Sequence, residues 1–263
     1  MSFIAHWHPE YEIIWQLDGY VDFMVDGTLY HLEPGEALFL HGDAVHGHAD
    51  FNAGYGRYFC FSFGEDFLCP DSKSYLYNRF FAPLSTGMLS FTTHITENES
   101  YEKEILEILR QLYRLNNDIP ENALSIQVCL LRIFDILFQN KALKPPRAPL
   151  PKKEIIKSAL WYINRNYTAS ITIQDIAKFL SVSSDHFSRI FKAATASTPK
   201  EYIQDLRIRH AVYEIKANPA RRLSEIAEDA GFLDPNYFAR AFKTKMGLTP
   251  SGYQKLLRAS PTP

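Results

Sequence analysis

The first twelve residues of the chain place two histidines and a glutamate at a spacing that suits a metal ion. The stretch "HWHPEYEIIWQLDG", residues 6–19, has the pattern H-x-H-x3-E. His6, His8 and Glu12 share parity, so on a continuous strand their side chains point to one face and the odd-numbered residues 11–17 to the other. Imidazole and carboxylate ligands suit Fe, Mn, Ni, Zn or Cu, and open positions on such an ion would allow catalysis.

Short strands follow this stretch and would position its side chains. The segment "VDFMVDGTLYHLEPGEALFLHGDAVHGH" alternates apolar and polar residues around a hairpin turn at Asp26-Gly27 and a second turn at Pro34-Gly35. It resembles a cupin, a small antiparallel β-barrel whose first motif is H-x-H-x3-E-x6-G. The resemblance implies that His46, from the second motif, joins His6, His8 and Glu12 as a fourth metal ligand.

The second motif departs from the cupin pattern at His41, Asp43 and Asp50. Three interpretations of the four-residue set therefore stay open. It holds a transition metal, or some of its members line a pocket for an organic ligand, or the histidines are structural. Trp7 and Trp15 either stack on a sugar ring in such a pocket or belong to the core.

The chain also repeats itself 51 residues apart. "FSRIFKAATASTPKEY" (187–202) and "FARAFKTKMGLTPSGY" (238–253) match at seven of sixteen positions. In each copy apolar residues recur at helical spacing, and a short helix with a tight turn precedes them. We therefore predict two helix-turn-helix units, which pair helices 172–180 with 184–195 and 222–231 with 235–246.

A continuous helix over residues 199–217 is predicted between the two units. At a rise of about 1.5 Å per residue it spans roughly 28 Å. Two second helices held at this distance suit successive major grooves, which lie roughly 34 Å apart on one face of B-DNA.

The repeat resembles the DNA-binding domain of the AraC/XylS family of bacterial transcription regulators. The shared features are F-x-R-x-F-K in each second helix and G-L-T-P-x-x-Y after the second unit, and the resemblance covers about residues 152–257. It implies that 184–195 and 235–246 are recognition helices, with Ala196 in place of a frequent glycine. The implied DNA-contacting residues are Ser184, Asp185, His186, Ser188, Arg189, Asn236, Tyr237 and Arg240, with Lys192 and Lys243 directed at phosphates.

Charge divides the chain in the same way. Residues 1–151 carry 10 Lys and Arg against 20 Asp and Glu, whereas residues 152–263 carry 18 against 10. A basic C-terminal half supplies the attraction to phosphate that DNA binding needs. We predict an α+β multidomain protein. Its parts are a cupin-like sensor barrel (1–98), two packing helices (99–140), a proline-rich linker (141–151) and the all-α double helix-turn-helix domain (152–258).

The two helices of region 99–140 have unbroken apolar stripes. The stripes either only pack on the barrel, or the second helix also pairs with its counterpart in another subunit. The family resemblance favours a homodimer formed through this half.

Cys60, Cys69 and Cys129 follow no metal-ligand spacing, and the start of the chain lacks the pattern of a secretory signal. The longest apolar stretch is broken by Arg132 and Asp135, so we expect a cytoplasmic protein that spans no membrane.

Together these features predict a regulator that binds promoter DNA. The resemblance implies an activator, contact with RNA polymerase and a small-molecule effector such as a sugar, without catalytic residues. One alternative is a metal-dependent cupin enzyme or metal sensor with a DNA-binding tail. Another is a DNA-architectural protein with a vestigial barrel.

Overall fold

The computed structural model describes residues 4–49, 56–86, 88–89, 93–143 and 153–259. The chain divides into two compact units. Among the described residues, one unit holds residues 5–48 and the later part of the chain up to residue 143, and the other holds residues 153–259. Most of the predicted linker, like Asp50, falls outside the described residues. The finer domain boundaries stay a prediction.

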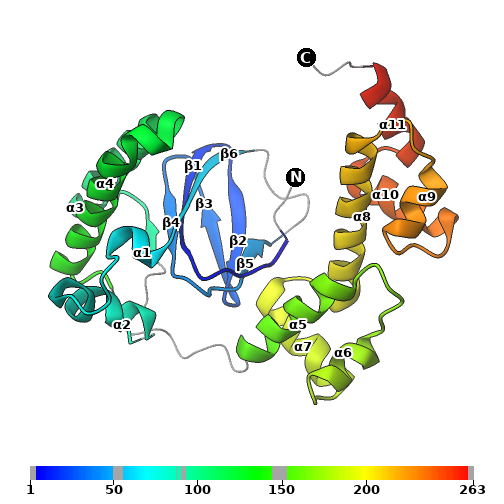
Figure 1. The fold of residues 1–263 in the computed structure, drawn as a ribbon, viewed down its shortest axis with the longest axis horizontal. Coiled ribbons are helices and arrows are strands. Elements are labelled where there is room, and N and C mark those ends of the chain that lie inside the picture. Colours follow the sequence, from blue (N-terminus) through cyan, green and yellow to red (C-terminus); the bar gives the residue numbers. More distant parts are fainter. Residues whose placement is uncertain (1–3, 50–55, 87, 90–92, 144–152, 260–263) are drawn as a thin grey trace. The chain divides into compact units, whose positions relative to one another are not determined.

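The first unit is built on two antiparallel sheets, as expected for the predicted α+β class (Figure 1). The four-stranded sheet has the order β6-β1-β4-β7, and the three-stranded sheet has the order β3-β2-β5. The strands are β1 (Tyr11–Asp18), β2 (Val21–Val25), β3 (Thr28–Leu32), β4 (Ala37–Leu40), β5 (His46–His48), β6 (Arg57–Phe63) and β7 (Thr93–Ile95).

The predicted hairpin between β2 and β3 is confirmed. Val25 pairs with Thr28, which leaves Asp26 and Gly27 as the two turn residues. Both have positive φ, 45° and 77°, as the twist of a two-residue hairpin requires.

Side chains alternate along β1 between two apolar layers. Ile13 and Trp15 belong to the cluster that contains the helices, whereas Ile14 packs with Leu38 and Phe23 in a separate cluster. Trp15 is therefore a core residue, and its indole N–H donates to the carbonyl of Gly35 at 3.2 Å. The alternative in which Trp15 stacks on a sugar is wrong.

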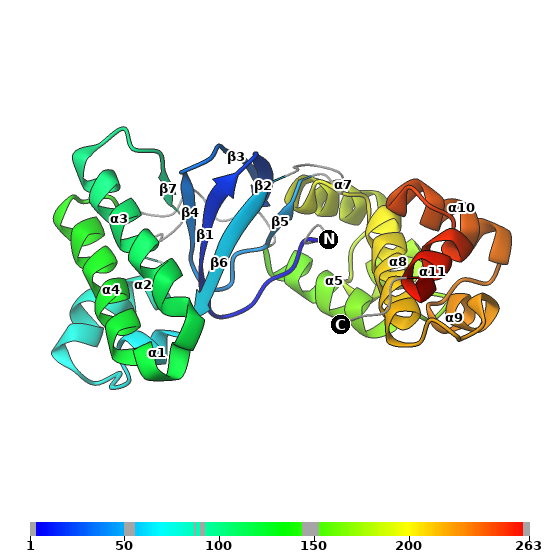
Figure 2. The same ribbon diagram turned by 90° about the horizontal axis from the view of Figure 1, so that it is seen from above.

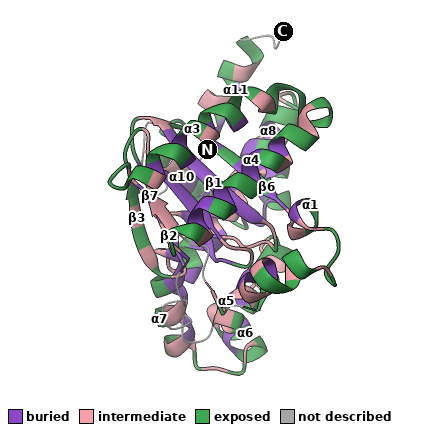
Figure 3. Cartoon of the chain, turned by 90° about the vertical axis from the view of Figure 1, so that its left-hand side faces the viewer, coloured by how far each residue is buried: buried purple, intermediate pink, exposed green. Residues whose placement is uncertain are grey.

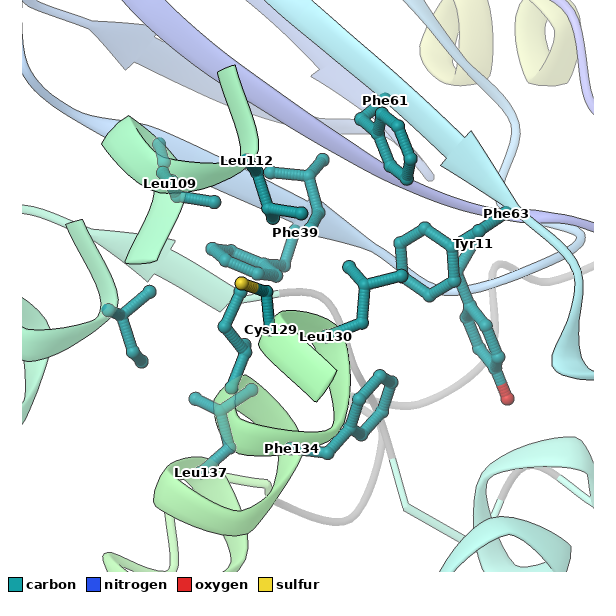
Figure 4. Close-up of a cluster of buried hydrophobic side chains, with 14 of the residues drawn as sticks. Tyr11, Phe39, Phe61, Phe63, Leu109, Leu112, Cys129, Leu130, Phe134 and Leu137 are labelled. Atoms are coloured by element: carbon teal, nitrogen blue, oxygen red, sulfur yellow. The ribbon is translucent and has the colours of Figure 1, made fainter. Parts of the chain in front are cut away.

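Two helices, α3 (Ser100–Leu115) and α4 (Ile119–Gln139), cover one face of the four-stranded sheet (Figures 1 and 2). Their inner stripes are buried against β1, β4 and β6, and Figure 4 shows Leu130 and Phe134 of α4 close to Tyr11 and Phe63. Each such side chain contributes about 1.5–3 kcal/mol when fully buried. The predicted packing of the pair on the barrel is thus confirmed for one face of each helix.

The sequence reasoning did not foresee the short helices between β6 and β7. They are α1 (Glu65–Leu68), η1 (Tyr77–Phe81) and α2 (Ala82–Ser85). Leu68, Phe81 and Leu84 are buried in the same core as α4, so these turns close one end of it.

Residues 153–259 of the second unit form helices joined by turns and loops, without a strand among them (Figure 2). Its helices are α5 (Lys153–Asn166), α6 (Ile173–Phe179), α7 (Ser184–Thr195), α8 (Pro199–Ala217), α9 (Leu223–Asp229), α10 (Pro235–Met246) and α11 (Pro250–Ala259). The bounds of α7, α8 and α10 match the prediction, and α6 and α9 are shorter than predicted. Figure 3 shows buried and exposed residues side by side on helices such as α5 and α7.

Local hydrogen bonds explain where these helices begin. Thr172 and Thr198 each form a capping box. The threonine hydroxyl accepts a hydrogen bond from the backbone N–H three residues later, and the carboxylate of that later residue accepts one from the threonine N–H. Asp234 caps α10 through the N–H of Asn236. These caps satisfy amide groups that the first turn of a helix leaves unpaired.

Candidate functional sites

The four predicted metal ligands lie together in the first unit. One nitrogen or oxygen of each of His6, His8, Glu12 and His46 lies within 4.8 Å of the others. The Nε2 atom of His8 is 2.9 Å from Oε2 of Glu12, and Nε2 of His46 is 3.4 Å from the same oxygen. Glu12 and His46 are buried, and His6 and His8 are half-buried.

These residues do not converge along one continuous strand, as the sequence predicted. His6 and His8 do not continue β1, which begins only at Tyr11, after Pro9. Instead His6 forms an isolated antiparallel bridge with His46, with backbone bonds of 2.8 and 2.9 Å in the two directions. The carbonyl of His8 accepts a bond of 2.7 Å from the N–H of Asp43. The segment is thus held by the strand β5 and the loop before it.

A backbone carbonyl fixes the ring orientation of His46, and a carboxylate lies beside the ring of His8. Nδ1 of His46 lies 2.9 Å from the carbonyl of Ala44, so this nitrogen carries the proton and Nε2 faces Glu12. Nδ1 of His8 lies 3.3 Å from a carboxylate oxygen of Glu10, while its Nε2 faces Glu12. Both imidazoles therefore direct Nε2 toward the same carboxylate.

Glu12 is held as a carboxylate by its neighbours. Burial by itself would raise the pKa of Glu12, but the contacts of its carboxylate with His46 and His8 hold that pKa well below its usual range. The same contact raises the pKa of His8, with burial acting in the opposite direction. The cluster is therefore a set of nitrogen donors around an anionic oxygen.

Sequence reasoning missed Cys60 as part of this site. Its thiol donates to Oε1 of Glu12 at 3.1 Å and leaves Oε2 to face the histidines. Burial, together with the charge of Glu12, raises the pKa of the thiol well above its usual range. The pairing of β1 with β6 places Cys60 in this site. Cys60 lies opposite Ile14 and therefore diagonally across from Glu12.

The predicted DNA-contacting residues lie on two short helices of the second unit. Phe187, Phe191, Phe238 and Phe242 are buried and anchor α7 and α10. Of the predicted contacts, Ser184, His186 and Ser188 are half-buried. The others are exposed: Asp185, Arg189, Lys192, Asn236, Tyr237, Arg240 and Lys243. Each helix therefore has an accessible polar face opposite its aromatic anchor.

Two of these side chains contact neighbouring residues in the absence of DNA. The guanidinium of Arg189 donates to Nδ1 of His186 at 3.1 Å, one turn earlier on α7. The hydroxyl of Tyr237 donates to Oε1 of Gln204 at 3.1 Å. Since Gln204 lies on α8, the second contact joins a recognition helix to the linker helix.

The linker helix α8 is tied to both helix-turn-helix units by further polar contacts. Arg207 donates to the carbonyls of Tyr167 and Ala169, at 2.7 and 2.9 Å, in the loop before α6. Lys245 of α10 pairs with the buried carboxylate of Asp205 at 2.7 Å. Burial raises the pKa of Asp205 in spite of this lysine.

A cavity of about 670 Å³ opens beside the second recognition helix. Tyr237 and Arg240 line it with residues of α8, of the start of α6 and of the turn before α10. Lys200 and Arg207 add positive charge to this wall. The carboxylate of Asp234 lies in the same lining.

A double-sheet unit with a polar cluster, joined in one chain to tandem helix-turn-helix units, defines a DNA-binding regulator with a sensor domain. Comparison with family models agrees with this class. The AraC-like ligand binding domain matches residues 1–132, half of the chain, and a helix-turn-helix domain matches residues 176–256. The chain belongs to the AraC family of transcriptional regulators, and its partners are DNA and a small-molecule effector.

Three curated relatives give the range of similarity. The uncharacterized HTH-type transcriptional regulator YdeC of Bacillus subtilis is 24% identical over 95% of this chain and 86% of its own length. The lactose operon transcription activator of Staphylococcus xylosus is 27% identical over 61% of this chain and 50% of its own length. The melibiose operon regulatory protein of Escherichia coli is 22% identical over 96% of this chain and 83% of its own length.

No helix among the described residues combines the length and hydropathy that a membrane span requires.

Proposed function

We propose that this protein is a transcription activator that responds to a carbohydrate bound in its N-terminal unit. The observation that carries the proposal is the pairing of a ligand-binding domain with two matched recognition helices in one chain. Two similar proteins are regulators of the lactose and melibiose operons, which supports a sugar as the effector class. The relatives are regulators, and we assign no catalytic role to any residue.

The exposed faces of α7 and α10 carry out DNA recognition in this proposal. Arg189 and Arg240 occupy equivalent positions in the repeat, and an arginine fork can bond a guanine edge or a phosphate. Lys192 and Lys243, one residue beyond the buried Phe191 and Phe242, are placed to neutralise phosphates. The remaining predicted contacts on α7 and α10 lie on the same polar faces and adjust register.

The exposed stripe of α4 supports a homodimer. Leu124 and Val128 are 74% and 57% exposed, and Leu131 follows at the next helical position. Three large apolar residues at i, i+4 and i+7 form a seam on the face of α4 opposite its buried stripe. We propose that this seam pairs with the same seam of a second copy.

Val128→Asp tests the dimer. Equilibrium ultracentrifugation of the full chain at micromolar concentration should show a dimer for the wild type and a monomer for this variant. Ser125→Asp, an exposed neighbour on α4 outside the stripe, is the matched control and should stay dimeric. A monomeric wild type would remove the dimer from the proposal.

The cellular setting follows from the same role. The three cysteines are free thiols, which suits the reducing cytoplasm where promoter DNA is found. An activator at a promoter also meets RNA polymerase, and we include that contact in the proposal.

The central experiment selects the preferred DNA sites from a random pool and then measures affinity by fluorescence anisotropy, with and without a panel of mono- and disaccharides. Arg240→Ala should weaken binding to the selected site by about 1–3 kcal/mol if Arg240 bonds a base. Lys216→Ala removes the same charge from the far end of α8 and is the control, with little expected change. If no sugar alters either DNA affinity or promoter output, the carbohydrate effector is wrong. If no sequence preference emerges, DNA recognition by these faces is wrong too.

A further inference from the structure

We propose that His6, His8, Glu12 and His46 bind one divalent first-row transition-metal ion. The four residues come from three separate parts of the first unit: the segment before β1, β1 itself and β5. This goes beyond the family assignment, which concerns an effector and DNA. It also does not depend on the effector being a sugar.

The strongest observation is a buried ring nitrogen that faces a buried carboxylate oxygen. Nε2 of His46 is buried and has no hydrogen-bond partner among the described residues, although it lies 3.4 Å from Oε2 of Glu12. Since Nδ1 of His46 donates to the carbonyl of Ala44, Nε2 is the ring nitrogen directed at the carboxylate. A buried ring nitrogen and a buried carboxylate oxygen this close are stabilised by a cation between them, either a proton or a metal ion.

The spacing fits coordination. Ligands at 2.0–2.1 Å from a tetrahedral ion are about 3.4 Å apart, and neighbouring ligands of an octahedral ion about 3.0 Å apart. The two contacts of Glu12 with His8 and His46, at 2.9 and 3.4 Å, fall in this range. The rings of His6 and His46 lie close as well, with centroids 4.3 Å apart.

The donor set selects the class of ion. Three imidazoles with one carboxylate suit Zn, Ni, Co, Cu or Fe, whereas Mg and Ca prefer sites made of oxygen atoms. Four protein ligands fill a tetrahedral shell and leave two open positions on an octahedral ion. We expect nitrogen-preferring ions to bind more tightly than Mg²⁺ by several orders of magnitude.

Second hydrogen bonds orient His46 and Glu12, as they orient ligands in known metal sites. The Ala44 carbonyl holds Nδ1 of His46, Glu10 lies beside Nδ1 of His8, and the thiol of Cys60 holds Oε1 of Glu12. We therefore assign Cys60 as a positioning residue for the ligand Glu12.

A close backbone approach also depends on one glycine. A β-carbon at Gly42 would collide with the carbonyl oxygen of Pro9, next to His8. Gly42 thus lets the loop before β5 lie against the segment that carries two of the ligands. A bound ion would cross-link that segment to β1 and β5, and should raise the unfolding temperature of the first unit.

The experiment uses tag-free, full-length protein that has been stripped with a chelator and dialysed. Zn²⁺, Ni²⁺, Co²⁺, Mn²⁺ and Mg²⁺ are titrated separately by calorimetry, and the bound metal is measured by plasma mass spectrometry. We expect one equivalent of a transition metal, a visible Co²⁺ absorption spectrum and an upward shift in melting temperature. Less than a tenth of an equivalent of every ion would overturn the proposal and leave protons as the cations of the cluster.

Variants separate ligands from bystanders. Glu12→Gln and His46→Gln should lose more affinity than the tenfold to hundredfold typical of orienting residues, and Cys60→Ala should lose about that amount, with rescue in Cys60→Ser. The matched control is His31→Gln, because His31 also lies between two carboxylates but is exposed.

Circular dichroism and melting curves identify variants that fail to fold. If the ligand variants fail to fold, the comparison of Cys60→Ala with Cys60→Ser still tests how Glu12 is positioned. Equal losses in His31→Gln and His46→Gln, or unchanged affinity in Glu12→Gln, would refute the assigned site. Equal affinities of Cys60→Ala and Cys60→Ser would refute the positioning role of Cys60.

Discussion

The ends of the two recognition helices offer a matched pair of substitutions. Ala196 follows α7 with φ 61° and ψ −4°, and Gly247 follows α10 with φ 73° and ψ −14°. Each N–H donates to the carbonyl four residues back, at 3.0 and 2.9 Å. The repeat thus uses the same left-handed helix end twice, with alanine in one copy and glycine in the other.

The magnitudes follow from this geometry. A left-handed conformation costs an L-residue about 1–2 kcal/mol, and the greater freedom of glycine in the unfolded chain offsets about 0.4–1 kcal/mol of that. At Gly247 an added β-carbon meets nothing within 4 Å, so Gly247→Ala should destabilise the second unit by about 1 kcal/mol. Ala196→Gly also loses part of a half-buried methyl group, so it should stabilise the unit by only about 0.5 kcal/mol.

Urea unfolding of the full chain measures both values, and amide hydrogen exchange of α7 and α10 assigns them to the two helix ends. DNA affinity should stay unchanged, because neither residue lies on the recognition face. Effects of the same sign at the two positions would refute the argument, since it depends on opposite exchanges of glycine and alanine at one backbone conformation.

Three further predictions concern the second unit. Thr198→Ala should cost about 1 kcal/mol by removing the cap of α8. This capping box lowers the pKa of Glu201, so its contribution to stability is present above pH about 4.5 and is lost as pH falls through the lowered pKa. The urea unfolding curves of Glu201→Gln and wild type should therefore converge in acid. Lys245→Ala should cost about 3 kcal/mol at neutral pH by leaving Asp205 as an unpaired buried charge. Burial already raises the pKa of Asp205, so thermal melts of this variant should approach those of wild type as acid protonates the carboxyl. Gly231→Ala should destabilise the turn before α10 because φ is +85° and a β-carbon would lie 2.6 Å from a backbone carbonyl oxygen, and a melt like that of wild type would contradict this.

The recognition helices were predictable because their signals are local. Ser183 and Asp234 supply side-chain caps, and the phenylalanines recur at helical spacing, so α7 and α10 have the predicted bounds. The contact between Asp205 and Lys245 could not be predicted in this way, since the two residues are 40 positions apart and meet only when α10 packs on α8. Short-range patterns determine helices, and packing determines which polar groups pair.

The cluster of His6, His8, Glu12 and His46 forms as predicted, but for a different structural reason. The alternation of side chains along a strand brings Glu12 and Ile14 to one face of β1. It does not extend to His8, because β1 begins only at Tyr11, after Pro9. Instead, a β-bridge between His6 and His46 brings the histidines together, and this bridge depends on where β5 lies in the three-stranded sheet. Cys60 reaches Glu12 through the pairing of β1 with β6, which periodicity alone does not encode.

The contacts of α8 also restrict how an effector can control DNA binding. Arg207 fixes the loop before α6 to this helix, and Asp205 and Gln204 fix α10 to it. A continuous helix of 19 residues with both units bonded to it resists a change in the distance between α7 and α10. A signal that changed this distance would have to break a buried ion pair and the bonds of Arg207 to backbone carbonyls. We therefore expect the effector to change the availability of the whole DNA-binding unit or the pairing of two copies, and not the spacing of recognition helices within one.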